Sequence, residues 1–279
     1  MNSLGLDLSD RGHVHAVVVD AAGAVHARAG GDDARAAVDQ AIHAKQAGLA
    51  GIASLLEDPG VAVAGIGSVI RCTPGAAAVA AEQWIGAAKG AQHAICLHVG
   101  EEVFAGLLLD GKPWGGAHNR AGAAAWLALN PVERQDYRRL GSLAAEISAK
   151  GIARRLSWRI QAGDRSRVLD AAGGSLDAIT GAMVFDGARG GDGVAISVIR
   201  DTAKYIGMAA ATLAAAIDPE VIVISGTVAA ADLMLEAVRQ ECGRRLPPDA
   251  MHDLRVEFSA LGSDAIAIGA ARLALAASA

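Results

Sequence analysis

The first 30 residues alternate short runs of β-forming residues with turn residues. The runs cover residues 4–8, 13–19 and 25–28, and Ser, Asp and Gly predominate between them. Because such residues favour turns, this pattern predicts three consecutive strands joined by short connections. In the longer segment that follows, residues 33–56, Ala, Gln, Lys and Leu predominate. We expect one helix there, beginning at an aspartate cap and ending at the Asp58-Pro59-Gly60 sequence.

The rest of the chain alternates apolar strands with Ala-rich helices. Strands are expected over residues 61–70, 94–99, 103–109, 112–114, 221–225 and 254–259. Helices are expected over residues 76–89, 133–155, 176–188, 193–217 and 229–245, and from residue 265 to the end of the chain. Such an alternation is typical of α/β proteins.

The order of these elements indicates a particular fold. Three antiparallel strands, a helix and another strand form the opening of the actin-like ATPase (ribonuclease H-like) fold, and a strand followed by a hairpin recurs after residue 90. We therefore predict two α/β lobes, a shortened N-terminal lobe over residues 1–90 and a C-terminal lobe over residues 91–279. The last helix is expected to pack back against the N-terminal lobe.

Composition argues against several classes of protein. The chain has 25 Lys and Arg against 30 Asp and Glu, a net charge of −5, so no nucleic-acid partner is expected. The densest basic stretches, residues 134–139 and 154–167, also contain acidic residues and are predicted as solvated helix faces. No signal peptide and no membrane span are recognised. Cys72, Cys96 and Cys242 lie too far apart for a metal-ligand motif, and we expect a soluble cytoplasmic protein.

Several stretches together resemble the ROK family of repressors, open reading frames and sugar kinases. They are residues 6–8 with 17–23, 107–118, 176–188 with 191–193, 218–226 and 261–271. The resemblance covers nearly the whole chain. It implies the actin-like fold, a small-molecule ligand such as a sugar or a nucleotide, and a homodimer formed through the C-terminal lobe. If kinase activity is retained, it also implies ATP and Mg²⁺ as cofactors.

The catalytic carboxylate implied by the resemblance is missing from this sequence. A kinase of the family uses an Asp, preceded by an Asn and followed by an Ala-rich helix, to accept the proton of the sugar hydroxyl. The corresponding positions fall near Thr73 and Pro74, and no aspartate lies between Asp58 and Asp110. We therefore predict no catalytic residue.

The two phosphate-binding turns implied by the resemblance are changed as well. In the family they are rich in Gly and Thr, so that backbone N–H groups can approach phosphate. The first turn here lacks adjacent glycines, and the second carries Glu101 and Glu102, which either repel phosphate and bind a cation or are simply solvated. Asp7 either holds Mg²⁺ through water or only caps its turn. The nucleotide-binding candidates, if that function is retained, are Asp7, Ser9, Gly100, Ser225, Gly226 and Thr227.

The sugar-contact loop and the zinc segment of the family are altered in the same way. The Glu and His of the family's Ala-Gly-Glu-x-Gly-His pattern correspond here to Ala123 and Trp126. Residues 141–144 replace the family's Gly-Cys-Leu-Glu, so no zinc or other metal is expected. The remaining candidates for ligand contact in the expected cleft are His98, Glu101, Glu102, His118, Asn119 and Trp126. Each of them has a structural alternative as a hydrogen-bonded, solvated or packed side chain.

Three functional hypotheses follow. The first is a pseudokinase, a member of the family that binds a small ligand or a partner protein, such as an active paralogue, without transferring phosphate. The second is an active ATP-dependent kinase of a hexose or an N-acetyl amino sugar whose base has moved. The third is an enzyme with different chemistry in the same cleft. We favour the first, because the base, both phosphate turns, the sugar-contact pair and the zinc segment are lost together.

Overall fold

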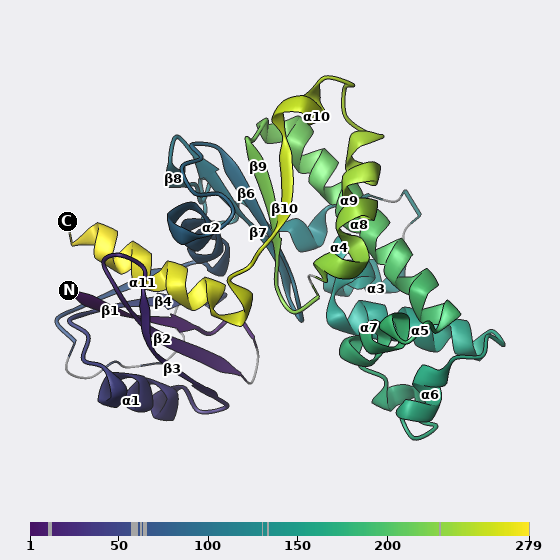
Figure 1. Cartoon of the computed structure of the whole chain (residues 1–279), viewed down its shortest axis with the longest axis horizontal. Helices are drawn as coiled ribbons and strands as arrows, with labels where there is room; N and C mark the ends of the chain where they lie inside the picture. The colour runs from purple at the N-terminus through teal and green to yellow at the C-terminus, as the bar shows by residue number, and fades with distance from the viewer. Residues whose placement is uncertain are drawn as a thin grey trace. The chain divides into compact units, whose positions relative to one another are not determined.

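Two five-stranded sheets and the helices around them make up this computed structural model (Figure 1). The structure describes residues 1–10, 13–56, 61, 63, 66–129, 131–132, 134–228 and 230–278. The strands are β1 (Asn2–Asp7), β2 (Val14–Asp20), β3 (Val25–Gly31), β4 (Leu49–Ala53), β5 (Ser68–Cys72), β6 (Ala94–Val99), β7 (Val103–Leu109), β8 (Lys112–Pro113), β9 (Val221–Ser225) and β10 (Arg255–Phe258). Their orders are β3-β2-β1-β4-β5 and β10-β9-β6-β7-β8, which agrees with the predicted actin-like α/β fold.

The helices fall mostly in the second half of the chain. They are α1 (Ala34–Ala44), α2 (Pro74–Ile85), α3 (Gln135–Leu140), α4 (Ser142–Ile147), α5 (Ala149–Gln161), α6 (Arg167–Ala171), α7 (Gly181–Arg189), α8 (Gly193–Ile217), α9 (Ala231–Gly243), α10 (Ala250–Asp253) and α11 (Ala265–Ala277). Short 3₁₀ turns are η1 (Ala124–Trp126), η2 (Leu176–Ala178) and η3 (Gly262–Asp264). Within the described part of the chain, no helix combines the length and the apolar composition that crossing a lipid bilayer requires.

Contacts within the chain divide it into two compact units. Unit 1 consists of Met1–His98, Phe104–Gly122 and Ser259–Ala279, and unit 2 consists of Val99–Val103 and Ala123–Phe258. The last helix, α11, therefore belongs to unit 1 by its contacts. The lobe boundary expected near residue 90 stays a prediction.

In unit 1, α11 lies between the first sheet and α2 (Figure 1). Gly5 of β1 and Gly51 of β4 are neighbours in register and face this helix. A Cβ atom on Gly51 would lie 1.9 Å from the carbonyl oxygen of Ala270, and one on Gly269 would lie 1.7 Å from that of Ala77 in α2. Small residues therefore let the backbones approach closely, which explains how an Ala-rich sequence builds a dense core.

The opposite face of the first sheet is covered by α1. Leu4 and Leu6 of β1 form an apolar cluster with Val38 and Ala41 of α1. Asp33 caps this helix, since its carboxylate accepts hydrogen bonds from the backbone N–H groups of the first turn. Both faces of the sheet are thus covered, and its central strands β1 and β4 are buried, as is typical of parallel strands, whereas β5 is exposed or partly buried.

The prediction of one helix over residues 33–56 is wrong for the second half of this segment. The helix α1 ends at Ala44, and Leu49–Ala53 is the buried strand β4 between β1 and β5. Composition favoured a helix here, but pairing with β1 and β5 and the close contact of Gly51 with α11 override it. Only the end of the strand expected over residues 61–70 is formed among the described residues, as the first part of β5.

The single helix expected over residues 133–155 is also wrong. Three helices, α3, α4 and α5, occupy this region, and residue 133 lies outside the described residues. Gly141 separates α3 from α4, because its φ of 89° interrupts the helix, and a glycine adopts this angle without strain. Ser148 starts the next helix, because its hydroxyl accepts a hydrogen bond from the N–H of Gly151. The helix expected over residues 176–188 is likewise divided, into η2 and α7, with Thr180 as the cap of α7.

Unit 2 is organised around α8, whose bounds are those expected from the sequence. Its buried face packs against α4, α5, α7 and α9. Asp192 caps its first turn, and Asp218, with a φ of 55°, ends it. The strand β9 that follows is buried along its whole length and runs parallel to β10.

Candidate functional site

The carboxyl ends of β1, β4 and β5 meet in one row at the edge of the first sheet. Asp7, Ala53 and Cys72 are the partners in register there. Asp7 is buried, and its carboxylate accepts a hydrogen bond of 2.9 Å from the N–H of Ser9. Burial raises the pKa of Asp7, and the neighbouring Asp10 adds to this effect. The site therefore offers a buried, turn-capping carboxylate at the end of β1.

Burial of Cys72, the cysteine in this row, disfavours its thiolate form. Burial, together with the negative charge of Asp7, raises the pKa of the Cys72 thiol to about 12. At neutral pH the thiol is therefore protonated, and only the thiolate is reactive. Its sulfur lies 3.6 Å from the carbonyl oxygen of Ile52.

The start of α2 occupies the place where the resemblance puts the catalytic carboxylate. β5 ends at Cys72, Thr73 caps α2, and Pro74 is the first residue of the helix. The Thr73 hydroxyl accepts a hydrogen bond of 3.2 Å from the N–H of Ala76. Neither the threonine nor the proline can take up a proton from a substrate hydroxyl, so this position has no general base.

In unit 2, the turn after β6 is tied to the start of α5. The carbonyl oxygen of Gly100 accepts a hydrogen bond of 2.9 Å from the N–H of Ala149. The carboxylate of Glu101 lies 3.1 Å from the ammonium group of Lys150. The side chain of Glu101 is thus paired with a cation of the same chain. Glu102 is partly buried, and its backbone carbonyl oxygen accepts a hydrogen bond from the N–H of Gly100.

The turn after β9 lies beside the same segment. Ser225 is buried, Gly226 has a φ of 100°, and Thr227 is exposed. The N–H of Val228 donates a hydrogen bond of 3.0 Å to the carbonyl oxygen of Val99. Unit 2 therefore brings the candidates at 225–227 close to those at 100–102, and only Gly226 uses a conformation that favours glycine.

The candidates of the loop after β8 are on the surface. His118 and Asn119 are exposed and form part of a turn, with a φ of 53° at Asn119. The Trp126 side chain is 58% exposed in η1, and the adjacent Ala123 is exposed as well. The loop is anchored at Gly122, whose carbonyl oxygen accepts a hydrogen bond of 2.7 Å from the N–H of Ala105.

His98 is packed rather than presented to solvent. Its ring stacks on Phe104, with the ring centres 4.5 Å apart and the planes 4° from parallel. Burial lowers the pKa of His98 to about 4, so the imidazole is neutral at physiological pH. A role in ligand contact stays a prediction.

Acid should destabilise the protein through His98. As the pH falls below about 6.5, the unfolded chain binds a proton at this residue, whereas the folded chain does not until its pKa of about 4 is reached. We expect the free energy of unfolding of the native protein to fall by about 3 kcal/mol more than that of His98→Phe between pH 7 and pH 4. Denaturant titrations at both values measure this. His118→Phe, at an exposed histidine, is the control, and equal losses in all three proteins would contradict the prediction.

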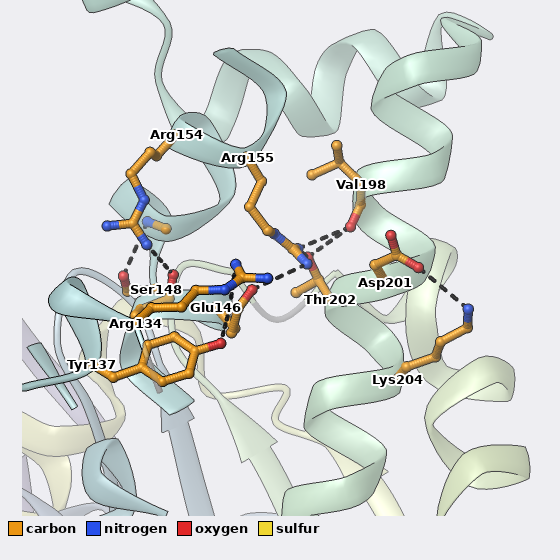
Figure 2. Close-up of polar contacts among 12 residues, drawn as sticks. Arg134, Tyr137, Glu146, Ser148, Arg154, Arg155, Val198, Asp201, Thr202 and Lys204 are labelled. Atoms are coloured by element: carbon orange, nitrogen blue, oxygen red, sulfur yellow. Dashed lines mark hydrogen bonds and ion pairs between the residues drawn. The ribbon is translucent and has the colours of Figure 1, made fainter. Parts of the chain in front are cut away.

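Sequence reasoning missed a buried polar cluster in unit 2. Glu146 of α4 is 3% exposed and accepts a hydrogen bond from the hydroxyl of Tyr137. Figure 2 shows Arg134 and Arg155 beside it, with guanidinium nitrogens 3.4 and 3.8 Å from its carboxylate oxygens. The interpretation of residues 134–139 and 154–167 as solvated helix faces is thus wrong for Arg155, which is 12% exposed. The signal that could have revealed the cluster is an acid inside the apolar run 143–147.

Among the residues that the structure describes, no group of three or more His, Cys, Asp and Glu side chains is arranged to hold a metal ion. Within the described residues, neither the row of Asp7 and Cys72 nor the turn with Glu101 forms such a group. The candidate features in the described part of the chain are a buried carboxylate, two turns and a cluster of arginines.

Comparison with known proteins places the chain in one family. Residues 70–277 match the ROK family. A glucokinase of Halalkalibacterium halodurans is 30% identical over 196 residues, which are 67% of this chain and 58% of that protein. The chain thus matches less than two thirds of the length of this relative.

Solved structures of the family share the fold. A ROK family glucokinase from Streptomyces griseus, in complex with glucose and AMPPNP, superposes with a TM-score of 0.84 at 23% identity and covers 99% of this chain and 100% of its own. A ROK family transcriptional regulator, a homologue of the Escherichia coli MLC protein, gives a TM-score of 0.82 at 20% identity, over 99% of this chain and 78% of its own. With the family match over residues 70–277, these results show that the chain is a sugar-kinase-like member of the ROK family.

Proposed function

We propose that this protein is a ROK family member that binds ligands without transferring phosphate. The start of α2 carries the proposal: Thr73 and Pro74 stand where a kinase of this family needs its proton acceptor. Phosphoryl transfer to a hydroxyl requires a group that orients the hydroxyl and takes its proton. A hydroxyl that is already hydrogen-bonded to the N–H of Ala76 and a proline ring supply neither.

The buried Asp7 does not replace the missing base in this proposal. Its carboxylate is held by the N–H of Ser9, and burial raises its pKa. It lies on β1, two strands away from the strand that leads into α2. In kinases with a Mg²⁺-bound nucleotide, a carboxylate at such a place assists metal binding, so Asp7 fits retained nucleotide binding better than proton transfer.

The turn with Glu101 and Glu102 supports the same conclusion. Phosphate-binding turns present backbone N–H groups and no negative charge. Here the N–H of Gly100 is hydrogen-bonded to the carbonyl oxygen of Glu102, and Lys150 is paired with Glu101. This turn therefore has less capacity for a triphosphate than a Gly- and Thr-rich one, whereas the glycine turn at Gly226 still permits close approach of a ligand.

A sugar and a nucleotide are the ligands to test first. The Streptomyces griseus structure holds glucose and AMPPNP, a nonhydrolysable nucleotide. We extend both ligand classes to this chain as part of the proposal. The homodimer implied by the resemblance belongs to the proposal too, and light scattering on the purified protein measures its mass against 28.1 kDa for one chain.

We expect no phosphate transfer from ATP to glucose, mannose, N-acetylglucosamine or N-acetylmannosamine in the presence of Mg²⁺. The assay follows ADP formation, with an active ROK glucokinase as the positive control. In the same preparation, at least one sugar or nucleotide is expected to stabilise the protein saturably against heat. A ligand at about a hundredfold excess over its dissociation constant adds about 2.7 kcal/mol to the free energy of unfolding.

Turnover with any of these sugars would contradict the proposal and support a kinase with a moved base. Two variants then locate the base. Asp7→Asn tests the buried carboxylate of β1, and Glu57→Gln combined with Asp58→Asn tests the acidic pair that lies outside the described residues. His118→Gln, a change of an exposed side chain, is the matched control.

A further inference from the structure

Unit 2 contains a cavity of about 600 Å³ that the proposed function does not use. Its walls come from the segment before α3, from α4 and α5, and from α8 and α9. The residues that line it include Glu146, Arg134, Arg155, Asp201 and Lys204. Figure 2 shows the carboxylate of Glu146 beside Arg134 and Arg155, and the pair of Asp201 and Lys204 on α8. A cavity of this volume suits a small organic molecule.

The charges that line the cavity are unequal. Five basic and three acidic side chains contribute to its walls. The acids are already neutralised from within the chain: Glu241 lies 2.7 Å from Arg245, and Asp201 lies 3.3 Å from Lys204. The third acid, Glu146, faces two arginines at once. Arg159 is paired with Asp164, which does not line the cavity. The remaining excess of positive charge comes from Arg134 and Arg155, which share the single carboxylate of Glu146, and this excess favours an anion.

Arg155 retains unused hydrogen-bonding capacity. One terminal nitrogen donates to the carbonyl oxygen of Val198, 3.1 Å away, and to the hydroxyl of Thr202. The other lies 3.8 Å from Glu146, too far for a hydrogen bond. Its Nε atom is buried without a hydrogen-bond partner among the described residues. A guanidinium group has five N–H donors, so this buried cation remains incompletely satisfied.

Arg134 is the more accessible cation of the pair. Its nearest nitrogen lies 3.4 Å from Glu146, and 46% of its side chain is exposed. Glu146 also accepts a hydrogen bond from the hydroxyl of Tyr137, so one carboxylate accepts hydrogen bonds from two donors and is the counter-charge of two arginines. Arg134 and Arg155 therefore lack a second acidic partner. A carboxylate or phosphate group bound in the cavity would be that partner and would accept charge-assisted hydrogen bonds from them.

The remaining wall is apolar. Leu129, Pro131, Trp158 and Met208 line the cavity together with the charged residues. Trp158 already contacts a guanidinium group, since Arg154 lies over its ring at 4.8 Å. A ligand with an anionic group at one end and a ring or alkyl body at the other would match both walls.

We propose that this cavity binds a small organic anion, a carboxylate or a phosphate ester with an apolar body, through Arg134, Arg155 and Lys204. The site goes beyond the proposed function, since none of its residues belongs to the turns or strand ends described above. Arg155 holds the anionic group from the floor of the cavity. Arg134 and Lys204, both partly exposed, close on it from the solvent side.

The test measures the melting temperature with phenyl phosphate, benzoate and inorganic phosphate, each against NaCl at equal ionic strength. We expect saturable stabilisation by phenyl phosphate, by benzoate or by both, and weaker stabilisation by inorganic phosphate. The first two probes distinguish a phosphate ester from a carboxylate. Arg134→Gln combined with Lys204→Gln should raise the dissociation constant of the organic probe that binds by about tenfold or more.

The matched control combines Arg35→Gln with Lys89→Gln, the same charge change at exposed residues of unit 1. It should bind like the native protein. The proposal is overturned if neither organic probe stabilises the protein beyond NaCl, or if both double variants bind equally. Melting temperatures without probe show that each variant is folded. Phosphate transfer from ATP would contradict the proposed function and leave the anion site untouched. Absence of probe binding in this test would overturn the anion site and leave the proposed function untouched.

Discussion

Replacing Gly269 with valine is expected to prevent the protein from folding. Gly269 lies in α11 where this helix meets α2, and a Cβ atom there would lie 1.7 Å from the carbonyl oxygen of Ala77. Backbone atoms cannot turn aside as a side chain can, so the two helices would have to separate. Because α11 also packs on β1 and β4, the displacement would open the core of unit 1. Most of a typical stability of about 5–15 kcal/mol would be lost.

Gly269→Ala gives a graded version of this experiment. Its single methyl group meets the same carbonyl, and we expect a loss of about 4 kcal/mol or more in the free energy of unfolding, measured by denaturant titration. Gly193→Ala, in the first turn of α8, is the matched control. No atom lies within 4 Å of a Cβ at that position, so its stability should stay equal or rise by up to about 1 kcal/mol. Similar stabilities of the two alanine variants would contradict the packing argument.

The sequence could predict elements whose signals are local. The three opening strands and the helix Gly193–Ile217 lie where residue type and caps place them. β4 could not be predicted in this way. Its residues favour a helix by composition, and only the contacts with β1, β5 and α11 make Leu49–Ala53 a strand. Such contacts join residues far apart along the chain, so composition carries no signal of them.

In the candidate site, too, local features could be predicted from the sequence and long-range contacts could not. That no carboxylate stands at Thr73 and Pro74 follows from the order of residues. The helix was expected from residue 76, and in the structure α2 begins two residues earlier, at Pro74. The pairing of Glu101 with Lys150 could not be foreseen, since 48 positions of the chain separate the two residues. The arginine cluster was missed for the same reason: Arg155 of α5 reaches Thr202 of α8. Long-range polar contacts are thus the part of a site that sequence patterns predict least well.

Membership in the ROK family and the stability of the fold rest on different features of the chain. Membership in the ROK family rests on the match over residues 70–277 and on the shared fold. The fold itself depends on glycine and alanine contacts such as those of Gly51 and Gly269, which do not involve the candidate site. Under the proposed function, the loss of catalytic groups therefore costs the fold little, and the scaffold persists as a binding protein.

Glu146→Ala is expected to destabilise the protein by about 3–5 kcal/mol, because it leaves a buried cation without its counter-charge. Arg155 is 12% exposed, and Glu146 is the carboxylate nearest to it among the ion pairs of the described residues. The hydroxyl of Tyr137 would lose its acceptor as well. Glu146→Gln keeps the shape and one acceptor oxygen, so a smaller loss is expected from it.

A double variant separates the cost of the orphaned charge from the cost of lost packing. Glu146→Leu combined with Arg155→Met removes both charges and keeps the approximate volume, and replacing a buried ion pair in this way is often neutral or stabilising. We therefore expect the double variant to be more stable than Glu146→Ala by at least about 2 kcal/mol in denaturant titrations. If the double variant is as unstable as Glu146→Ala, packing rather than charge is the reason for the loss. That result would also weaken the case for Arg155 as an unsatisfied buried cation, on which the anion site depends.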